Sequence, residues 1–142
     1  KKLDVWLGGF APSELKRVGR LGDGWLPSFV TPADAAEGRR VIEQVCAEHN
    51  REIEDDHYGV LIPYSMTGVP DAVLEQLAKR RPDLDPRTLV PTTWDELTNL
   101  IRQFVDVGTS KFVVLPMNEP HAPDEWTSHL EELADVVRPL ET

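Results

Sequence analysis

The sequence predicts an α/β fold built around a parallel sheet, and three observations support this prediction. Short apolar runs with strand character alternate four times with amphipathic helical segments. The segment 3–27 has the order strand, double-glycine turn, helix and strand, which is one βαβ unit. The run His57–Tyr64 is apolar almost throughout, as expected for a strand that is covered on both faces.

The first βαβ unit organises the rest of the chain. Residues 3–7 form an apolar run with strand character, and Gly8 and Gly9 end it. Pro12 suits the first turn of a helix, because its missing N–H would have had no partner there. Gly22 is expected to end that helix, and residues 23–27 form the second strand.

The next helix has the clearest start signal. Thr31 is a good N-cap, Pro32 fits the first helical position, and Asp34 nearly completes a capping box. The remaining expected elements are helices over 32–50, 70–79, 93–108 and 123–137 and strands over 57–64 and 111–116. The segment 80–91 contains three prolines and is expected to be irregular.

Length and charge limit the classes of function. The 142 residues suffice for one compact domain, and the net charge of −10 argues against nucleic acid or an anionic membrane as partner. An anionic cofactor would need local positive charge, which Lys16, Arg17 and Arg20 could supply, unless they form only a solvated helix face. Cys46 is a single cysteine on an apolar helical stripe, so we expect packing rather than reactivity. With no membrane span or signal peptide in the sequence, we expect a soluble, cytoplasmic protein.

Three stretches carry a resemblance to a known family. They are VWLGG at 5–9, RLGDGWLP at 20–27 and the final strand SKFVVLP at 110–116. This pattern resembles the luciferase-like superfamily of flavin- and F420-dependent oxidoreductases, and most of all its F420-dependent branch. The resemblance implies a TIM (β/α)8 barrel, which needs roughly 250 residues. Residues 1–142 would then be a single half-barrel domain, the C-terminal half with strands five to eight and their helices.

The turn Gly8–Ala11 is the main candidate site. Its glycines let the backbone approach a ligand closely, and the N–H groups that follow point outward at the positive end of a helix, which suits a phosphate. The resemblance implies that this turn contacts the phosphate end of the flavin or F420. Many relatives have a hydroxyl residue at the position of Phe10 or Ala11, so here the backbone would have to suffice. The alternative is a turn whose glycines serve packing alone. The predicted cofactor-binding residues are Gly8, Gly9, Phe10, Ala11 and Trp25, although a tryptophan in a short barrel strand such as Trp25 is usually a core residue.

Other loops at the C-terminal ends of the strands supply weaker candidates, since ligands bind there in parallel α/β folds. Ser28 and Phe29 follow the second strand, and His121 follows the last one; all three are substrate-pocket candidates. A loop histidine such as His121 could also be merely solvated. No histidine or cysteine pair has metal-ligand spacing, so no metal is expected. No catalytic residue can be named, because in the relatives the residues nearest the reacting ring come mainly from the N-terminal half.

The leading interpretation is the C-terminal part of an F420-dependent oxidoreductase that transfers hydride between F420 and an unknown organic substrate. The alternatives are an FMN-dependent monooxygenase and a non-catalytic half-barrel that self-associates. The isolated chain is expected to be inactive without the N-terminal half of the barrel. It is also expected to associate as a homo-oligomer, because its first and last strands would be open edges. The apolar side chains then left without an opposing wall are those of Val5, Leu7, Val60, Ile62, Val113 and Leu115, or of their alternates.

Overall fold

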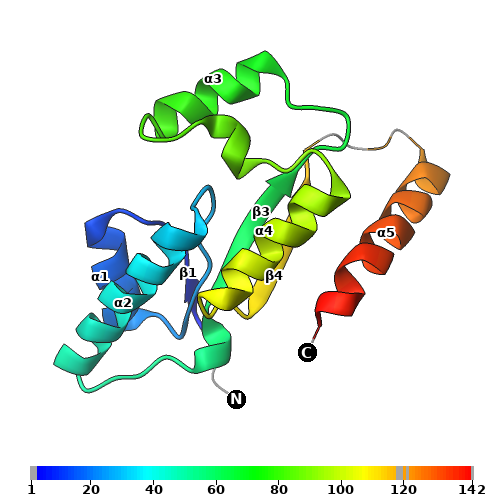
Figure 1. Ribbon diagram of the computed structural model, residues 1–142. Helices are drawn as coiled ribbons and strands as arrows, with labels where there is room; N and C mark the ends of the chain where they lie inside the picture. The colour runs from blue at the N-terminus through cyan, green and yellow to red at the C-terminus, as the bar shows by residue number, and fades with distance from the viewer. Residues whose placement is uncertain (1–2, 118–119, 121, 142) are drawn as a thin grey trace. The chain divides into compact units, whose positions relative to one another are not determined.

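The computed structural model describes residues 3–117, 120 and 122–141. The chain divides into two compact units, which we describe separately (Figure 1). The first unit consists of residues 1–62 and 103–114, and the second of residues 63–102 and 115–142. No helix among the described residues is both long and apolar enough to span a lipid bilayer.

The first unit holds the strands in sequential order. They are β1 (Trp6–Leu7), β2 (Gly24–Trp25), β3 (Gly59–Tyr64) and β4 (Lys111–Pro116), the last two of which extend into the second unit. Trp6 pairs with Gly24 and Leu7 with Trp25, both in parallel. Parallel bridges then join Trp25 to Tyr58 and Ser28 to Leu61, and β3 pairs with β4.

The sequential order of the strands identifies the kind of parallel sheet. In a doubly wound sheet the strand order reverses at a switch point, whereas in a β/α barrel each strand lies beside its predecessor along the chain. The order β1, β2, β3, β4 in the first unit is of the second kind. The expected parallel α/β fold is therefore confirmed, and its strand order is that of part of a barrel.

The core of the first unit lies between the strands and two helices, α1 (Pro12–Leu21) and α2 (Pro32–Glu48). Gly19 lets α1 approach α2 closely, because a Cβ there would collide with Val45. Gly38 likewise leaves room for the ring of Trp25. The buried residues of this core are Leu15, Val18, Trp25, Ile42, Cys46, Ile53 and Tyr58.

Specific hydrogen bonds fix the start of α2 and the end of α1. The Thr31 hydroxyl accepts a hydrogen bond from the N–H of Asp34, and the Asp34 carboxylate accepts one from the N–H of Thr31, so the predicted capping box is confirmed. The C-terminus of α1 is capped from a distance by Arg51, whose guanidinium donates to the carbonyls of Gly19 and Gly22. A cation is favoured there because it faces the negative end of the helix dipole.

The second unit contains α3 (Asp71–Arg80), a 3₁₀ turn η2 (Pro86–Leu89), most of α4 (Trp94–Asp106), α5 (Pro123–Val137) and a 3₁₀ turn η3 (Arg138–Leu140). A further 3₁₀ turn, η1 (Asp55–His57), precedes β3 in the first unit. The Thr92 N–H donates to the Glu96 carboxylate, and the Thr93 hydroxyl accepts from the Glu96 N–H, which fixes the start of α4. The hydrogen bonds from Thr92 hold the pKa of the Glu96 carboxyl below its usual value.

Two expectations need correction. The first two strands are only two residues long. Backbone bonds from Asp23 to Val5 and from Leu26 to Leu7 flank the paired residues, but the Val5 N–H donates to the Asp23 side chain instead of extending the ladder. Gly22 ends α1 as predicted, with φ −79°. The apolar strand residues also fall into two groups. Val60 and Ile62 are 1% and 2% exposed, on the same side of β3 as the core residue Tyr58, whereas Val113 and Leu115 on β4 are 41% and 48% exposed.

The open strand edges lead to a testable prediction about association. Val5 next to β1 and Val113 on β4 are exposed apolar residues, and such edges are usually covered. We expect the isolated 142-residue chain to sediment as a dimer or larger species at high concentration. Sedimentation velocity across a wide concentration range measures this. A folded monomer throughout, with no binding of a hydrophobic dye, would contradict the prediction.

Candidate functional site

The turn after β1 holds a carboxylate from its own helix. The backbone N–H groups of Phe10 and Ala11 both donate to one Glu14 carboxylate oxygen, over 3.0 and 2.9 Å. Gly9 has φ +91°, and a Cβ there would collide with the same carboxylate. A side chain at position 9 is therefore excluded both by the left-handed backbone and by the space that Glu14 fills.

The Glu14 carboxylate oxygen stands where an oxygen of an anionic ligand would bind. Two converging N–H groups at the positive end of a helix form the donor set that suits phosphate or carboxylate. These two N–H groups can therefore bind an oxygen of an anionic ligand only if the Glu14 carboxylate moves away from them. The sequence pattern indicated the donors but not their internal acceptor, although Glu14 three residues after the N-cap Ala11 is the spacing of a capping box.

The buried side chain of Trp25 is hydrogen-bonded to this turn. It is 1% exposed, and its indole N–H donates to the Gly9 carbonyl over 2.9 Å. The structure thus brings together Trp25 and the Gly8–Ala11 turn, with the indole beneath the turn instead of at its surface. Its place in the core fits the alternative interpretation of Trp25, and the hydrogen bond gives it a role in shaping the turn.

The candidates after the other strands are less closely grouped. Ser28 is exposed and bridges to Leu61 on β3. Phe29 is partly buried and has φ +58°, which is a strained backbone for a bulky residue and is found more often near functional sites. His121 lies outside the described residues, so its place in the substrate pocket stays a prediction.

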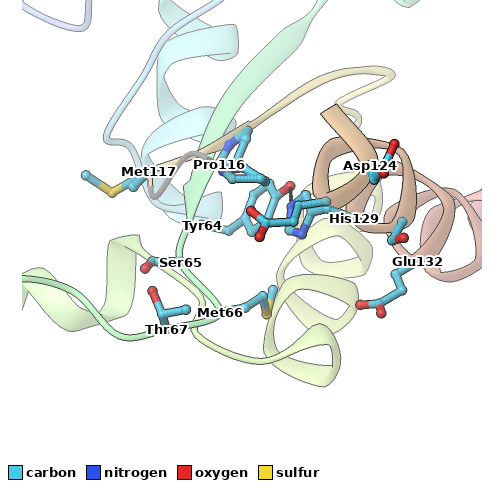
Figure 2. A pocket seen from close by; sticks show the side chains of 12 residues that line it. Tyr64, Ser65, Met66, Thr67, Pro116, Met117, Asp124, His129 and Glu132 are labelled. Atoms are coloured by element: carbon cyan, nitrogen blue, oxygen red, sulfur yellow. Dashed lines mark hydrogen bonds between the residues drawn. The ribbon is translucent and has the colours of Figure 1, made fainter. Parts of the chain in front are cut away.

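The second unit contains a separate candidate site, an open cleft of about 1210 Å³ at the C-terminal ends of β3 and β4 (Figure 2). Its walls come from the segments 64–67 and 116–117, from Pro120, and from α5. The cleft lies beside the loops that follow β3 and β4, at the C-terminal ends of strands, where ligands bind in parallel α/β folds. The residues that line it through their side chains include Tyr64, Met66, Met117, Asp124, His129 and Glu132.

A tyrosine–histidine pair forms the most defined feature of this cleft. The Tyr64 hydroxyl lies 2.6 Å from Nε2 of His129, and the two rings stack at an interplanar angle of 9° (Figure 2). Trp94 and Trp126 pack around the same imidazole. Burial raises the pKa of the Tyr64 hydroxyl, so the phenol keeps its proton and can donate it to Nε2.

The remaining groups of the cleft are acidic and apolar. Asp124, Ser128 and Glu132 follow one another at four-residue intervals on α5, so they share one face of the helix. Met66 and Met117 add polarisable apolar surface. Such a lining suits an organic group with hydrogen-bond donors better than a phosphate, since like charges would repel it.

The pairing of Tyr64 with His129 could not be inferred from the sequence. The two residues are 65 positions apart, one on a strand and one on a helix. The available signal was weak: Tyr64 ends a buried strand, and His129 lies three residues after Trp126 on the apolar side of its helix.

One further group of potential ligand atoms occurs among the described residues. Glu54, Asp56 and His57 place their oxygens and a ring nitrogen within 4.8 Å of one another, before β3. His57 Nδ1 bonds the Asp23 carbonyl over 2.7 Å. No second observation points to an ion at this cluster, and acidic surface groups are common without one.

Comparison with known proteins shows the fold. No protein-family model matches the chain, and no curated protein sequence matches it. Among solved structures it is similar to an F420-dependent secondary alcohol dehydrogenase in complex with an F420–acetone adduct, with a TM-score of 0.58 and 15% identity over 82% of this chain and 44% of that one. It is also similar to the coenzyme F420-dependent tetrahydromethanopterin reductase from Methanopyrus kandleri, with a TM-score of 0.53 and 19% identity over 95% of this chain and 49% of that one. The monooxygenase RslO1 from Streptomyces bottropensis matches with a TM-score of 0.57 and 12% identity, over 96% of this chain and 47% of that one.

These matches confirm the predicted resemblance at the level of the fold. The chain folds like part of each of these three structures, two of which are named as F420-dependent enzymes and one as a monooxygenase. It spans about half the length of the structures that it matches. That share agrees with a partial barrel.

The ionisation of the two tyrosines tests whether their side chains are buried. Burial raises the pKa of both Tyr58 and Tyr64, so in the folded state each phenol binds its proton more tightly than in the unfolded chain. Their contribution to stability is therefore complete below about pH 10, the unfolded value, and is lost as the pH rises above it. At pH 10 about half of the tyrosine in an unfolded chain is ionised, so we expect ultraviolet absorbance to show less tyrosinate than that in the folded chain. Two ionised tyrosines at that pH, with the circular dichroism of the folded chain intact, would contradict the burial of both rings.

Proposed function

We propose that the chain is the C-terminal part of an F420-dependent oxidoreductase of the luciferase-like type. Its activity would be hydride transfer between F420 and an organic substrate whose identity the sequence does not reveal. The observation that carries the proposal is the Gly8–Ala11 turn, where two N–H groups already bind an anionic oxygen at the end of a barrel-type strand. The likeness in fold to two proteins named as F420-dependent supports the choice of cofactor.

In this proposal the chain's own residues bind and orient. The N–H groups of Phe10 and Ala11 would hold an oxygen of the cofactor phosphate, and Gly9 would keep the backbone open to it. Trp25 would hold the turn in place through its bond to the Gly9 carbonyl. F420 supplies the hydride chemistry when bound. Ser28, Phe29 and His121 remain the proposed substrate-pocket residues, and the residues next to the reacting ring would come from the N-terminal half of the barrel.

An FMN-dependent monooxygenase is the second candidate, and a specific observation favours it. One structure of the same fold, which matches nearly the whole chain, is named as a monooxygenase. A phosphate-binding turn serves either cofactor equally well, since FMN and F420 both carry a phosphate group. The choice between them therefore depends on the rest of the pocket.

The cofactor proposal can be tested by titration of the full protein that carries this sequence with both cofactors. We expect F420 to bind at least about tenfold more tightly than FMN, a difference of roughly 1.4 kcal/mol. Fluorescence of each cofactor provides the readout. Tighter binding of FMN, together with oxygen-dependent turnover of a substrate, would favour the monooxygenase instead. Failure to bind either cofactor would favour a non-catalytic, self-associating half-barrel.

The phosphate site can be tested through Glu14. Glu14→Gln removes the charge that competes with an incoming phosphate, and an exposed charge pair at close range is worth about 1 kcal/mol, so affinity for the cofactor should rise about fivefold. Gly9→Val should lower the affinity strongly, because a β-branched residue fits neither the positive φ nor the space.

The control for Glu14→Gln is Asp4→Asn, which removes one exposed charge at the other end of β1 and should leave the affinity unchanged. Fluorescence titration measures all three variants, and thermal melting shows whether each is folded. Unchanged affinity in folded Glu14→Gln and Gly9→Val proteins would rule the turn out as the phosphate site.

A further inference from the structure

A second, smaller cleft lies in the first unit, at the opposite ends of the strands from the Gly8–Ala11 turn. It has a volume of about 290 Å³ and sits where α2 ends and the chain returns to β3. Because the strands run parallel, the start of β3 and the end of β1 lie at opposite ends of the strands. The cleft is lined mainly by Glu43, Cys46, Arg51, Ile53, Asp55 and Tyr58.

The cleft includes a buried polar group without a partner. Tyr58 is 3% exposed, and its hydroxyl has no hydrogen-bond partner among the described residues. Leaving a buried donor unpaired is unfavourable, and native proteins do so rarely. Arg39 covers one face of the ring, with its guanidinium carbon 4.3 Å from the ring centre, and so helps to hold the ring in place.

The two arginines near Tyr58 already have hydrogen-bond partners. Arg39 binds Glu43 over 2.7 Å and Asp55 over 2.5 Å. Arg51 donates to two backbone carbonyls of the α1 C-terminus. No cation of the lining is therefore left for an anionic ligand, and the rim carboxylates would repel one. Burial, and then the negative charge of Glu43, raise the pKa of the Tyr58 hydroxyl, so it remains a donor.

The floor of the cleft is apolar. Cys46 and Ile53 are 3% and 6% exposed, and the Cys46 thiol is directed to the Gly19 carbonyl. Burial raises the pKa of that thiol, so it packs as a small neutral group. The volume is near the lower end of what small-molecule pockets have, which limits an occupant to a few heavy atoms. Glu43 also lines the cleft, and its side chain is 52% exposed, so it has room to turn toward solvent when a molecule enters.

We propose that this cleft binds a small neutral molecule with an acceptor oxygen and a short apolar part, such as an amide, a ketone or an alcohol. The oxygen accepts the hydrogen bond of the Tyr58 hydroxyl, and the apolar part lies against Cys46 and Ile53. This site is separate from the proposed cofactor turn and does not depend on the identity of the cofactor.

The test uses butyramide as probe, with butyrate and butylammonium as charged molecules of similar size. The full protein that carries this sequence is labelled with ¹⁵N, and chemical shifts near Cys46 and Tyr58 are followed during titration. We expect saturable shifts with butyramide at millimolar concentration and at least about tenfold weaker binding of both charged probes. Absence of saturable shifts with butyramide, or equal binding of a charged probe, would overturn the proposal.

Tyr58→Phe separates binding from folding. Because it removes a hydroxyl without a partner, the variant should melt at the same temperature as the parent or higher, and it should bind butyramide at least about tenfold more weakly. Thr88→Val is the control: it removes an exposed hydroxyl that is hydrogen-bonded to the Asp85 carbonyl in the second unit, outside both clefts, so it should bind butyramide like the parent. Unchanged butyramide binding in Tyr58→Phe would show that the hydroxyl does not hold the ligand.

Discussion

The buried indole of Trp25 is the interaction on which the first unit depends. Its backbone pairs with Leu7 on one side and Tyr58 on the other, which places it between β1 and β3. Its ring lies against Gly38 of α2, where any larger residue would collide with it, and its N–H donates to the Gly9 carbonyl. One residue thus determines the spacing of a helix, the order of three strands and the shape of the candidate phosphate turn. Few side chains other than tryptophan combine that apolar area with a directed donor.

The parts of the fold that could be predicted from the sequence are those that depend on local chemistry. The strand Lys111–Pro116 and the helix Pro123–Val137 have the predicted bounds, because an apolar run and a proline-started amphipathic helix are decided by neighbouring residues. The capping box of Thr31 and Asp34 is of the same kind. The two-residue length of β1 and β2 was missed, since it depends on which distant backbone groups pair.

The candidate sites were predictable only where the backbone makes them. The glycines and the helix start identified a turn that can bind an anionic oxygen, and the structure shows that its N–H groups do bind one, from Glu14. The Tyr64–His129 pair and the unpartnered Tyr58 hydroxyl depend on side chains brought together by the fold. The sequence contains no spacing that would indicate either of them. Whether Ser28, Phe29 and His121 serve a substrate pocket stays a prediction.

The turn needs an internal acceptor such as Glu14 while no ligand is bound. The chain carries a net charge of −10, so an anionic ligand approaches it against an unfavourable field. A turn with two unpaired N–H groups at a helix start would also be costly when no ligand is bound. Glu14 satisfies both donors from within the same helix turn, and its side chain can be displaced without disturbing the backbone bonds of α1. The phosphate of a cofactor has at least the charge and the acceptor oxygens of one carboxylate, so it could replace Glu14 when the rest of the cofactor adds binding energy. The same carboxylate that stabilises the free protein would then set a threshold for binding, because an anion must make more contacts than Glu14 does in order to displace it.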